Sequence, residues 1–264
     1  MDKSYNTKRV GVMSAMREEI DALIQEMSLT QKISLGGRTF YVGKLFRQEV
    51  VIVFSHWGKV AASITATQLI NSFDIGELIF TGVAGSIDSQ VNIGDLVVGS
   101  ELIQHDMDAS PLYPPQTLPV INLRELVTQD SDKLELAAKN TITTLASELD
   151  SDIVSEFKLQ NSRLHSGLIL TGDQFVSDQK TAESLKHKFK EAICVEMEGA
   201  AVAQVCHAYN IPFSVLRIIS DKADDNANID FPKFAKYVAS EISLIFFRYL
   251  FSGSQNTYLC SNQK

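Results

Sequence analysis

Cysteine, long apolar runs and excess positive charge are all scarce in this 264-residue sequence. The three cysteines, Cys194, Cys206 and Cys260, show no C-x-x-C spacing, and two of them lie among apolar residues. This pattern predicts buried free thiols in a reducing compartment rather than disulfides or a zinc site. No apolar run approaches the roughly 20 residues that span a bilayer, and no signal-peptide core follows the charged N-terminus. We therefore expect a cytoplasmic protein without a membrane partner.

Acidic residues outnumber basic ones, with 32 Asp and Glu against 24 Lys and Arg, and the net charge is -8. This balance argues against nucleic acid as a partner, because little positive charge is available to neutralise phosphates. The glycine-rich fingerprints G-x-G-x-x-G and G-x-x-x-x-G-K are also missing, so we expect no dinucleotide or ATP cofactor. A neutral or zwitterionic small molecule is the expected ligand.

Composition and element order together predict one α/β domain. The chain is 45% hydrophobic, which is sufficient for one large core at this length. Short apolar strands alternate with segments of helical spacing, without an internal repeat or a linker that would divide the chain. We expect the domain to cover residues 1–251 and residues 252–264 to form a polar tail.

An acidic cluster follows two apolar strands in the second half of the chain. Residues 192–195 form a short apolar run, Glu196 and Glu198 follow it, and apolar residues then recur at helical spacing. A second strand, residues 213–219, leads to Asp221. Because ligands of α/β proteins bind beyond the carboxyl ends of strands, we expect these three carboxyl groups around one pocket. In the alternative interpretation, Asp221 caps a turn and one glutamate is solvated at a helix N-terminus.

The first strand, residues 9–14, also leads into an acidic turn. Glu18 and Glu19 lie where the next helix begins, a position that favours acidic residues through the helix dipole. Glu19 is the candidate for a functional role. Strand patterns also occur at residues 32–35, 38–45 and 49–54, with Gly36 and Gly37 between the first two, and predict a hairpin or meander.

Two further strands end in turns suited to a ligand. The buried strand 77–81 ends in small residues that include Gly85, a candidate substrate contact where a ligand can approach the backbone closely. The strand 164–170 ends in a turn that contains Phe175. Residues 105–130 hold four of the six prolines and show no periodicity, so we expect a functional loop or a subunit contact there.

Two helices are predicted from amphipathic patterns in the second half of the chain. Ser131 is the expected N-cap of a helix whose buried face includes Leu145, and residues 150–161 are expected to be a polar connection. Asp230 is the expected cap of a last helix whose apolar face includes Phe234.

Together these segments resemble the 5′-methylthioadenosine/S-adenosylhomocysteine nucleosidases of the nucleoside phosphorylase superfamily. The resemblance extends from residue 9 to residue 251 and is most specific in the turn 16–19, the run 195–198 and the segment 217–221. It implies a mixed central sheet that closes into a distorted barrel surrounded by helices, usually in a homodimer. It also implies irreversible hydrolysis of the bond between adenine and ribose, without a metal or organic cofactor.

The resemblance further implies a role for each matching residue. Glu19 would activate the attacking water, Asp221 would protonate N7 of the purine, and Glu198 would hold the ribose hydroxyls. Phe175 would stack on adenine, and the backbone of Val176 would bind the edge of the ring. The other implied contacts are Ser220 and Arg217, which would support Asp221 and neighbouring polar groups, and Met16, Met197 and Phe231, which would contact the ribose and the 5′-alkylthio group.

The chemistry of such a reaction requires two carboxyl groups in opposite states. Cleavage builds positive charge on the sugar and negative charge on the departing purine, so an acid and a base act at opposite ends. Asp221 must hold a proton near neutral pH, which burial would favour, whereas Glu19 must be ionised. A purine nucleoside phosphorylase on the same fold stays an alternative, although phosphate would meet Glu18 and Glu19 with a single Arg17 beside them. A nucleoside-binding protein without catalysis is another.

Two segments depart from the family pattern. The family often has a small hydroxyl residue where Val83 stands, and residues 105–113 differ from the aromatic-glycine pattern that closes the 5′ pocket of the partner subunit. Leu112 and Tyr113 are the candidates for that contact. The sequence therefore leaves the substrate open among methylthioadenosine, S-adenosylhomocysteine, 5′-deoxyadenosine and aminodeoxyfutalosine.

Overall fold

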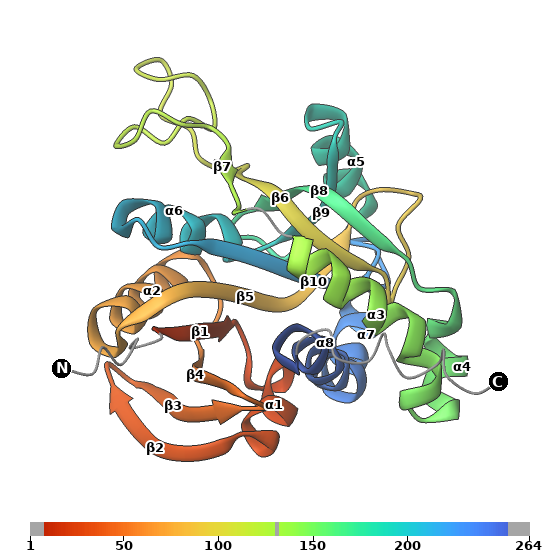
Figure 1. The fold of residues 1–264 in the computed structure, drawn as a ribbon. Helices are drawn as coiled ribbons and strands as arrows, with labels where there is room; N and C mark the ends of the chain where they lie inside the picture. Colours follow the sequence, from red (N-terminus) through yellow and green to blue (C-terminus); the bar gives the residue numbers. More distant parts are fainter. Residues whose placement is uncertain (1–7, 130–131, 253–264) are drawn as a thin grey trace.

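The computed structural model describes residues 8–129 and 132–252. Within these ranges the strands form one mixed sheet surrounded by helices (Figure 1). Part of the sheet closes into a barrel, because β10 pairs with β6 on one side and with β5 on the other. The predicted fold class is therefore confirmed. The barrel strands are β5 (Ile75–Ser86), β6 (Leu96–Gln104), β8 (Leu164–Thr171), β9 (Ala192–Glu196) and β10 (Phe213–Asp221).

The first part of the chain extends the sheet beyond the barrel. β1 pairs in parallel with both β5 and β4, and β4 continues through antiparallel β3 to β2. The hairpin predicted around Gly36 and Gly37 is confirmed, and their φ values of 58° and 78° suit residues without a Cβ atom. These strands are β1 (Arg9–Ser14), β2 (Ser28–Leu35), β3 (Arg38–Leu45) and β4 (Gln48–Phe54).

The strand directions bring several carboxyl ends to one place. β5 runs parallel to β1 and β10 but antiparallel to β9, and it pairs with β9 where both strands end. There Gly85 lies opposite Val195, and Ser86 lies opposite Cys194. β10 reaches the same place, with Asp221 opposite Gly85. The turn after β9 and the end of β10 therefore lie beside the small-residue end of β5.

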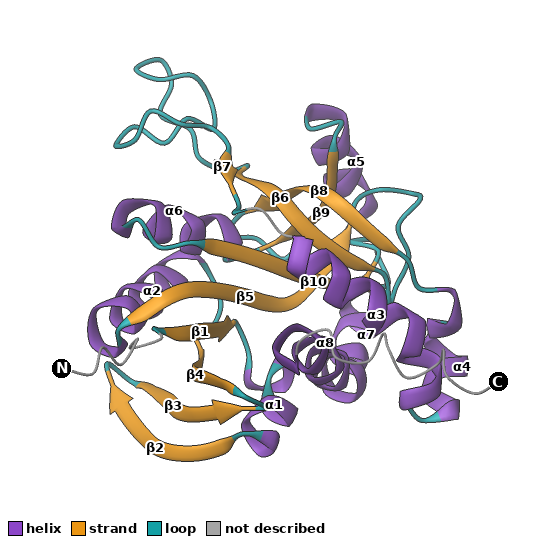
Figure 2. Ribbon diagram, viewed as in Figure 1, coloured by secondary structure: helices purple, strands orange, loops and turns teal. Residues whose placement is uncertain are grey.

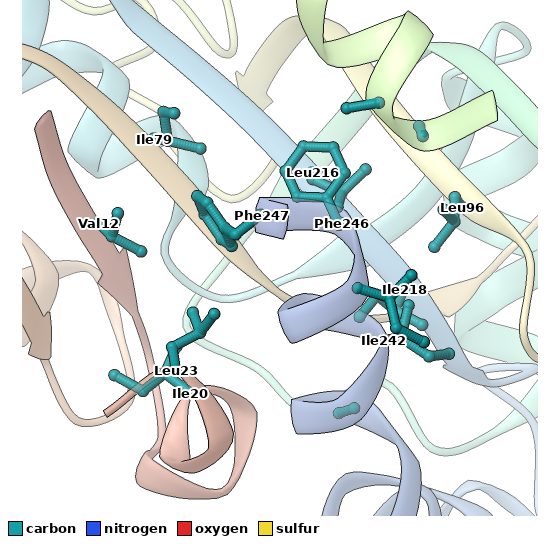
Figure 3. Close-up of a cluster of buried hydrophobic side chains, with 14 of the residues drawn as sticks. Val12, Ile20, Leu23, Ile79, Leu96, Leu216, Ile218, Ile242, Phe246 and Phe247 are labelled. Carbon is teal, nitrogen blue, oxygen red and sulfur yellow. The ribbon is translucent and has the colours of Figure 1, made fainter. Parts of the chain in front are cut away.

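A large apolar core separates the sheet from the C-terminal helix α8 (Ser240–Ser252). Figure 3 shows Phe246 and Phe247 of this helix in one cluster with side chains from three strands, among them Val12, Ile79 and Leu216. All five side chains are buried. Burying an apolar side chain of this kind stabilises the fold by about 1.5–3 kcal/mol, so the packing of α8 holds β1, β5 and β10 together.

The last helical region begins earlier than predicted. Asp230 is not a cap, because α7 (Ala227–Phe234) begins before it and the N–H of Asp230 donates to the carbonyl of Asn226 at 3.1 Å. Between α7 and α8 the chain forms a π-helical segment, η3 (Ala235–Ala239). Apolar spacing continues across this segment, so periodicity alone could not reveal the irregular turn.

The expected polar connection at residues 150–161 is also wrong. It contains α4 (Ser151–Phe157), where the side chain of Asp150 accepts the N–H of Asp152 at 2.9 Å and caps the helix. Burial of Val154 against the core stabilises a helix too short to show a clear period. The preceding helix α3 (Asp132–Glu148) agrees with the prediction, whereas its expected cap Ser131 lies outside the described residues.

Residues 105–125 form a long loop that projects from the barrel and ends at the short strand β7 (Leu126–Val127), as Figure 2 shows. No helix within the described ranges is long and apolar enough to cross a bilayer. Most of the expected tail, residues 253–264, lies outside these ranges. The other helical segments are η1 (Arg17–Glu19), α1 (Asp21–Glu26), α2 (Lys59–Phe73), η2 (Leu159–Asn161), α5 (Gln179–Lys188) and α6 (Gly199–Tyr209).

Candidate active site

A cavity of about 260 Å³ lies where β1, β5, β9 and β10 end. Most of the residues selected from the sequence meet in its wall, although they come from six separate segments of the chain. Val176 and Arg217 are buried outside this wall. The selected residues that line the cavity are Met16, Glu19, Gly85, Phe175, Met197, Glu198, Ser220, Asp221 and Phe231.

Glu19 lies in the turn η1 and is 2% exposed. Its Oε2 accepts hydrogen bonds from the N–H groups of Ala15 (3.1 Å) and Met16 (2.9 Å) and from the hydroxyl of Ser14. Its Oε1 accepts the N–H of Val83 at 2.8 Å, a contact that does not depend on the side chain at position 83. Burial raises the pKa of Glu19, whereas these donors favour the ionised form and oppose the rise.

Two glycines of β5 make room for two different carboxyl groups. A Cβ atom at Gly82 would lie 2.7 Å from Oε1 of Glu19 and 3.0 Å from a guanidinium nitrogen of Arg217. A Cβ atom at Gly85 would lie 2.8 Å from Oδ1 of Asp221. Both glycines therefore allow a carboxyl group to approach the strand backbone closely.

Asp221 ends β10 and is 1% exposed. The hydroxyl of Ser220 donates to its Oδ2 at 2.8 Å, and the N–H of Ala223 donates to its Oδ1 at 2.8 Å. Burial raises the pKa of Asp221 to about 6 in spite of these two donors. A carboxyl group with this pKa holds a proton near neutral pH far more often than a solvated aspartate does.

Glu198 precedes α6, and its side chain lines the same cavity. The N–H of Gly58, in the turn between β4 and α2, donates to its Oε1 at 2.7 Å. Burial and the nearby charge of Glu196 raise the pKa of Glu198 to about 8, and the hydrogen bond from Gly58 opposes that rise. The carboxyl group can accept further hydrogen bonds from a ligand.

Glu196, for which the resemblance implied no role, lines the cavity as well. It accepts the N–H of Gly199 at 2.7 Å, the guanidinium of Arg217 at 2.5 Å and the hydroxyl of Thr171. Arg217 thus supports Glu196 and the start of α6; the resemblance implied that it would support Asp221 and neighbouring polar groups. The signal for Glu196 is its position in the Glu-Met-Glu run directly after a buried strand.

Aromatic and sulfur-containing side chains form most of the remaining wall. The rings of Phe175 and Phe231 lie with their centroids 5.5 Å apart. Met16, Met197 and Trp57 also line the cavity. The loop candidates Leu112 and Tyr113 are exposed and lie outside the wall, which does include Asn228 and Pro232 of α7, two residues without a distinctive sequence signal.

A second, more open cavity of about 780 Å³ adjoins the first. The two share Met16, Trp57 and Phe231, and the second also has Arg17 and Lys236 in its wall. A ligand that is longer than the inner cavity could therefore extend past these shared side chains towards charged groups.

The charge of the inner cavity limits what it can bind. Among the residues described, its wall contains four carboxyl groups and no Lys, Arg or His. Phosphate would be repelled there, whereas hydroxyl groups of a neutral ligand could donate to the carboxylates. Within the same ranges, no group of three or more His, Cys, Asp or Glu side chains is arranged to hold a metal ion.

The family pattern of the phosphorylase superfamily matches residues 9–250. The chain belongs to this superfamily. Within it, the chain belongs to the nucleosidases that include methylthioadenosine/S-adenosylhomocysteine and aminodeoxyfutalosine nucleosidases.

Two relatives illustrate this placement. The aminodeoxyfutalosine nucleosidase of Helicobacter pylori (strain ATCC 700392 / 26695) is 36% identical over 86% of this chain and 91% of its own length. The 5′-methylthioadenosine/S-adenosylhomocysteine nucleosidase of Staphylococcus carnosus is 35% identical over 89% of this chain and 96% of its own.

Solved structures agree with the sequence relatives. The Neisseria meningitidis 5′-methylthioadenosine/S-adenosylhomocysteine nucleosidase in complex with methylthio-immucillin-A matches with a TM-score of 0.79 and 31% identity, over 92% of this chain and 98% of that one. A Helicobacter pylori mutant nucleosidase with 5′-methylthioadenosine in the active site matches with a TM-score of 0.77 and 34% identity, over 93% and 98%.

Proposed function

We propose that this protein hydrolyses the N-ribosidic bond of 5′-thioadenosine nucleosides and releases adenine and the free thioribose. The observation that carries the proposal is the set of three buried carboxyl groups, Glu19, Glu198 and Asp221, which reach one cavity from separate segments. Each is held by donors of its own. The nucleosidase relatives support the reaction class.

In this proposal Asp221 is the general acid. The departing purine gains negative charge as the bond breaks, and a proton delivered to N7 neutralises it. A pKa of about 6 supports this role, because the protonated form is present near neutral pH and still gives up its proton readily. The hydroxyl of Ser220 keeps the carboxyl group in place.

Glu19 is the general base that activates the attacking water. Its four hydrogen bonds hold it beside β5. Burial raises the pKa of Glu19, and a carboxylate with a raised pKa is a stronger base towards water. Positive charge that builds on the sugar is stabilised by the ionised carboxylates around it.

The other wall residues bind the nucleoside. Glu198 accepts hydrogen bonds from the ribose hydroxyls, and Phe175 stacks on the adenine ring, whose edge is bound by the backbone of Val176. Arg217 acts indirectly, through its ion pair with Glu196. Met16, Met197 and Phe231 contact the ribose and the 5′-alkylthio group, which their adaptable apolar surface suits.

The experiment that tests the proposal is adenine release from 5′-methylthioadenosine with and without phosphate, with the sugar product identified by mass spectrometry. We expect equal rates and free sugar, because the cavity wall carries carboxyl groups and Arg17 is paired with Asp21 at 3.1 Å. A ribose 1-phosphate product would establish phosphorolysis instead. Binding without any release of adenine would establish a nucleoside-binding protein.

Aminodeoxyfutalosine is the second candidate substrate, supported by the relative that carries this activity at 36% identity. The outer cavity of about 780 Å³ provides room for a larger 5′ substituent than methylthio. The ratio of kcat/KM for aminodeoxyfutalosine, S-adenosylhomocysteine and methylthioadenosine, measured under the same conditions, decides between the candidates.

We also propose a homodimer in the cytoplasm. Large apolar side chains are exposed at the start of α2 and on the projecting loop, with Val60 71% and Leu112 85% exposed. Light scattering at micromolar concentration should report twice the chain mass of 29.2 kDa, and a particle of one chain mass would contradict the dimer. The buried free thiols of Cys194 and Cys206 support a reducing compartment.

A further inference from the structure

Lys59 lies where three loops at the rim of the candidate active site meet. It is the first residue of α2, directly after the turn that follows β4. Asp106 lies just beyond the end of β6, where the projecting loop begins, and Asp173 lies in the turn after β8. None of the three residues lines the inner cavity, and none has a role in the reaction as proposed.

The contacts among these residues form a closed cycle. The ammonium group of Lys59 donates to Oδ1 of Asp106 at 2.6 Å, and Oδ2 of Asp106 accepts the N–H of Asp173 at 2.9 Å. Oδ1 of Asp173 in turn accepts the N–H of Lys59 at 2.8 Å. Each residue thus contacts both of the others, so that moving one loop disturbs the other two.

The cycle is better shielded than an ordinary surface ion pair. The Lys59 side chain is 17% exposed, and its nitrogen also lies 3.9 Å from Oδ2 of Asp173. Burial by itself would raise the pKa of Asp106, but the hydrogen bonds from Lys59 and from the N–H of Asp173 bring it below its usual value. Asp106 therefore remains ionised throughout the neutral range, and the cycle persists there.

The cycle is joined to the cavity through the residue before Lys59. Gly58 donates its N–H to Glu198 at 2.7 Å, with a φ of 92°. A Cβ atom at Gly58 would lie 3.0 Å from Oδ1 of Asp173, so the Asp173 carboxylate packs closely against the Gly58 backbone. The position of the Gly58 N–H consequently depends on where Lys59 and Asp173 are held.

We propose that Lys59 is a positioning residue for the reaction: by joining the three loops it keeps the N–H of Gly58 on the carboxylate that binds the ribose. The inference rests on the proposed function for its kinetic consequence, but its structural consequence is independent of turnover. It also connects the projecting loop, which includes Asp106, to Glu198 through Lys59 and Gly58.

The test is the pKa of Glu198, followed by carboxyl 13C NMR in the ligand-free protein for wild type and Lys59→Met. Loss of the cycle frees Gly58, removes a hydrogen bond that favours ionised Glu198, and should raise this pKa further above 8, by about one unit. The charged groups that face Glu198 are Glu196, Arg217 and Glu19, and the variant leaves all three in place.

The kinetic consequence follows from the same shift. Below its pKa, each unit of increase reduces the ionised fraction of Glu198 tenfold, so the affinity for 5′-methylthioadenosine at pH 7 should fall roughly tenfold. The effect should appear in KM, with kcat changed much less, because the acid and the base are untouched. Lys59→Arg, which keeps the charge, should recover most of the loss.

Lys186→Met is the matched control. It removes an ion pair of the same length, 2.6 Å to Asp88, from a lysine that lies on α5 outside the inner cavity. We expect no change in the pKa of Glu198 and no change in KM. An equal effect in the control and in Lys59→Met would show a general response to lost charge and overturn the proposal.

Several outcomes separate positioning from simple stabilisation. A lower melting temperature of Lys59→Met with an unchanged pKa of Glu198 would overturn the proposal. If Lys59→Met does not fold, Asp106→Asn, which breaks the cycle at its other end, must move the pKa in the same direction. If the wild type releases no adenine, the proposed reaction fails, whereas the NMR titration still decides whether Lys59 positions Gly58.

Discussion

The turn after β1 and the end of β10 each hold a buried carboxyl group in the same cavity, but they hold it differently. Glu19 accepts four hydrogen bonds, three of them from backbone N–H groups, whereas Asp221 accepts two. Burial raises the pKa of both groups, but the charge of Arg217 opposes the rise at Glu19, whereas the charges of Asp230 and Asp224 add to it at Asp221. Donors and neighbouring charges, rather than residue type, can therefore assign opposite roles to two carboxyl groups.

Removing the proposed acid, Asp221, should have the largest effect on adenine release. Asp221→Asn keeps the shape of the side chain but has no proton to deliver, so we expect adenine release to fall by about 10⁴-fold. Affinity for 5′-methylthioadenosine, measured by calorimetry, should stay within an order of magnitude. More than a tenth of wild-type turnover would show that another group is the acid.

Removing the proposed base, Glu19, should have the next largest effect on adenine release. We expect Glu19→Gln to reduce adenine release by about 10³-fold, because an amide cannot take a proton from water. Ser14→Ala is the matched control: it keeps the carboxylate and three of its four donors, and should cost turnover about tenfold or less. Single-turnover assays of both variants check this, and full activity of Glu19→Gln would assign the base elsewhere.

The two glycines of β5 allow each carboxyl group to be displaced without changing its chemistry. Gly82→Ala should push on Glu19 and Gly85→Ala on Asp221, and a misplaced catalytic group costs about 100-fold in turnover. Gly37→Ala is the control, because its added Cβ meets nothing within 4 Å while its φ of 78° is unfavourable for alanine. That variant should lose stability but keep kcat, which would separate strain from displacement at Gly82, where φ is 150°; Gly85 has no positive φ, so Gly85→Ala tests displacement alone.

The pH dependence of kcat/KM tests the protonation states of the carboxyl groups without any substitution. In the free protein Asp221 must be protonated, with a pKa of about 6, and Glu198 ionised, with a pKa of about 8. Because the protonated fraction of Asp221 falls as the ionised fraction of Glu198 rises, kcat/KM should be flat between about pH 6 and 8 and fall tenfold per unit outside this range. In Glu198→Gln the flat region should be lost, with a decrease from about pH 6 upwards.

The smallest expected effect is on stability, where the two carboxyl groups should differ in sign. The pKa of Asp221 is raised to about 6 in the folded protein, so its stabilising proton is lost as the pH rises through 6. Asp221→Asn should therefore raise the melting temperature by about 4 °C at pH 8, and by less as the pH approaches 4. Glu19→Gln also relieves the cost of a buried charge, since burial raises the pKa of Glu19, but its amide N–H₂ would face backbone donors, so it should lower the melting temperature. Calorimetry of both variants at two pH values checks the signs.

Local patterns accounted for most of the fold. The strands around residues 9–14, 38–45 and 213–219 were predicted within a few residues, because apolar runs and turn residues act over short distances. The helix α4 and the π-helical segment η3 were missed, since a short helix and a change of hydrogen bonding leave the apolar spacing almost unchanged. The carboxyl-end rule brought Glu198 and Asp221 together correctly, as two strand ends in one cavity.

The α/β class, the acidic residues at the strand ends and the resemblance that implies a reaction could all be predicted from the sequence. Each of them depends on short patterns of neighbouring residues. Only the tertiary structure decided what surrounds each carboxyl group. Gly58 reaches Glu198 across 140 residues of chain, and Val83 reaches Glu19 across 64. A pKa depends on burial and on donors from such distant segments. The different surroundings of Asp221, the proposed acid, and Glu19, the proposed base, therefore follow from the tertiary structure.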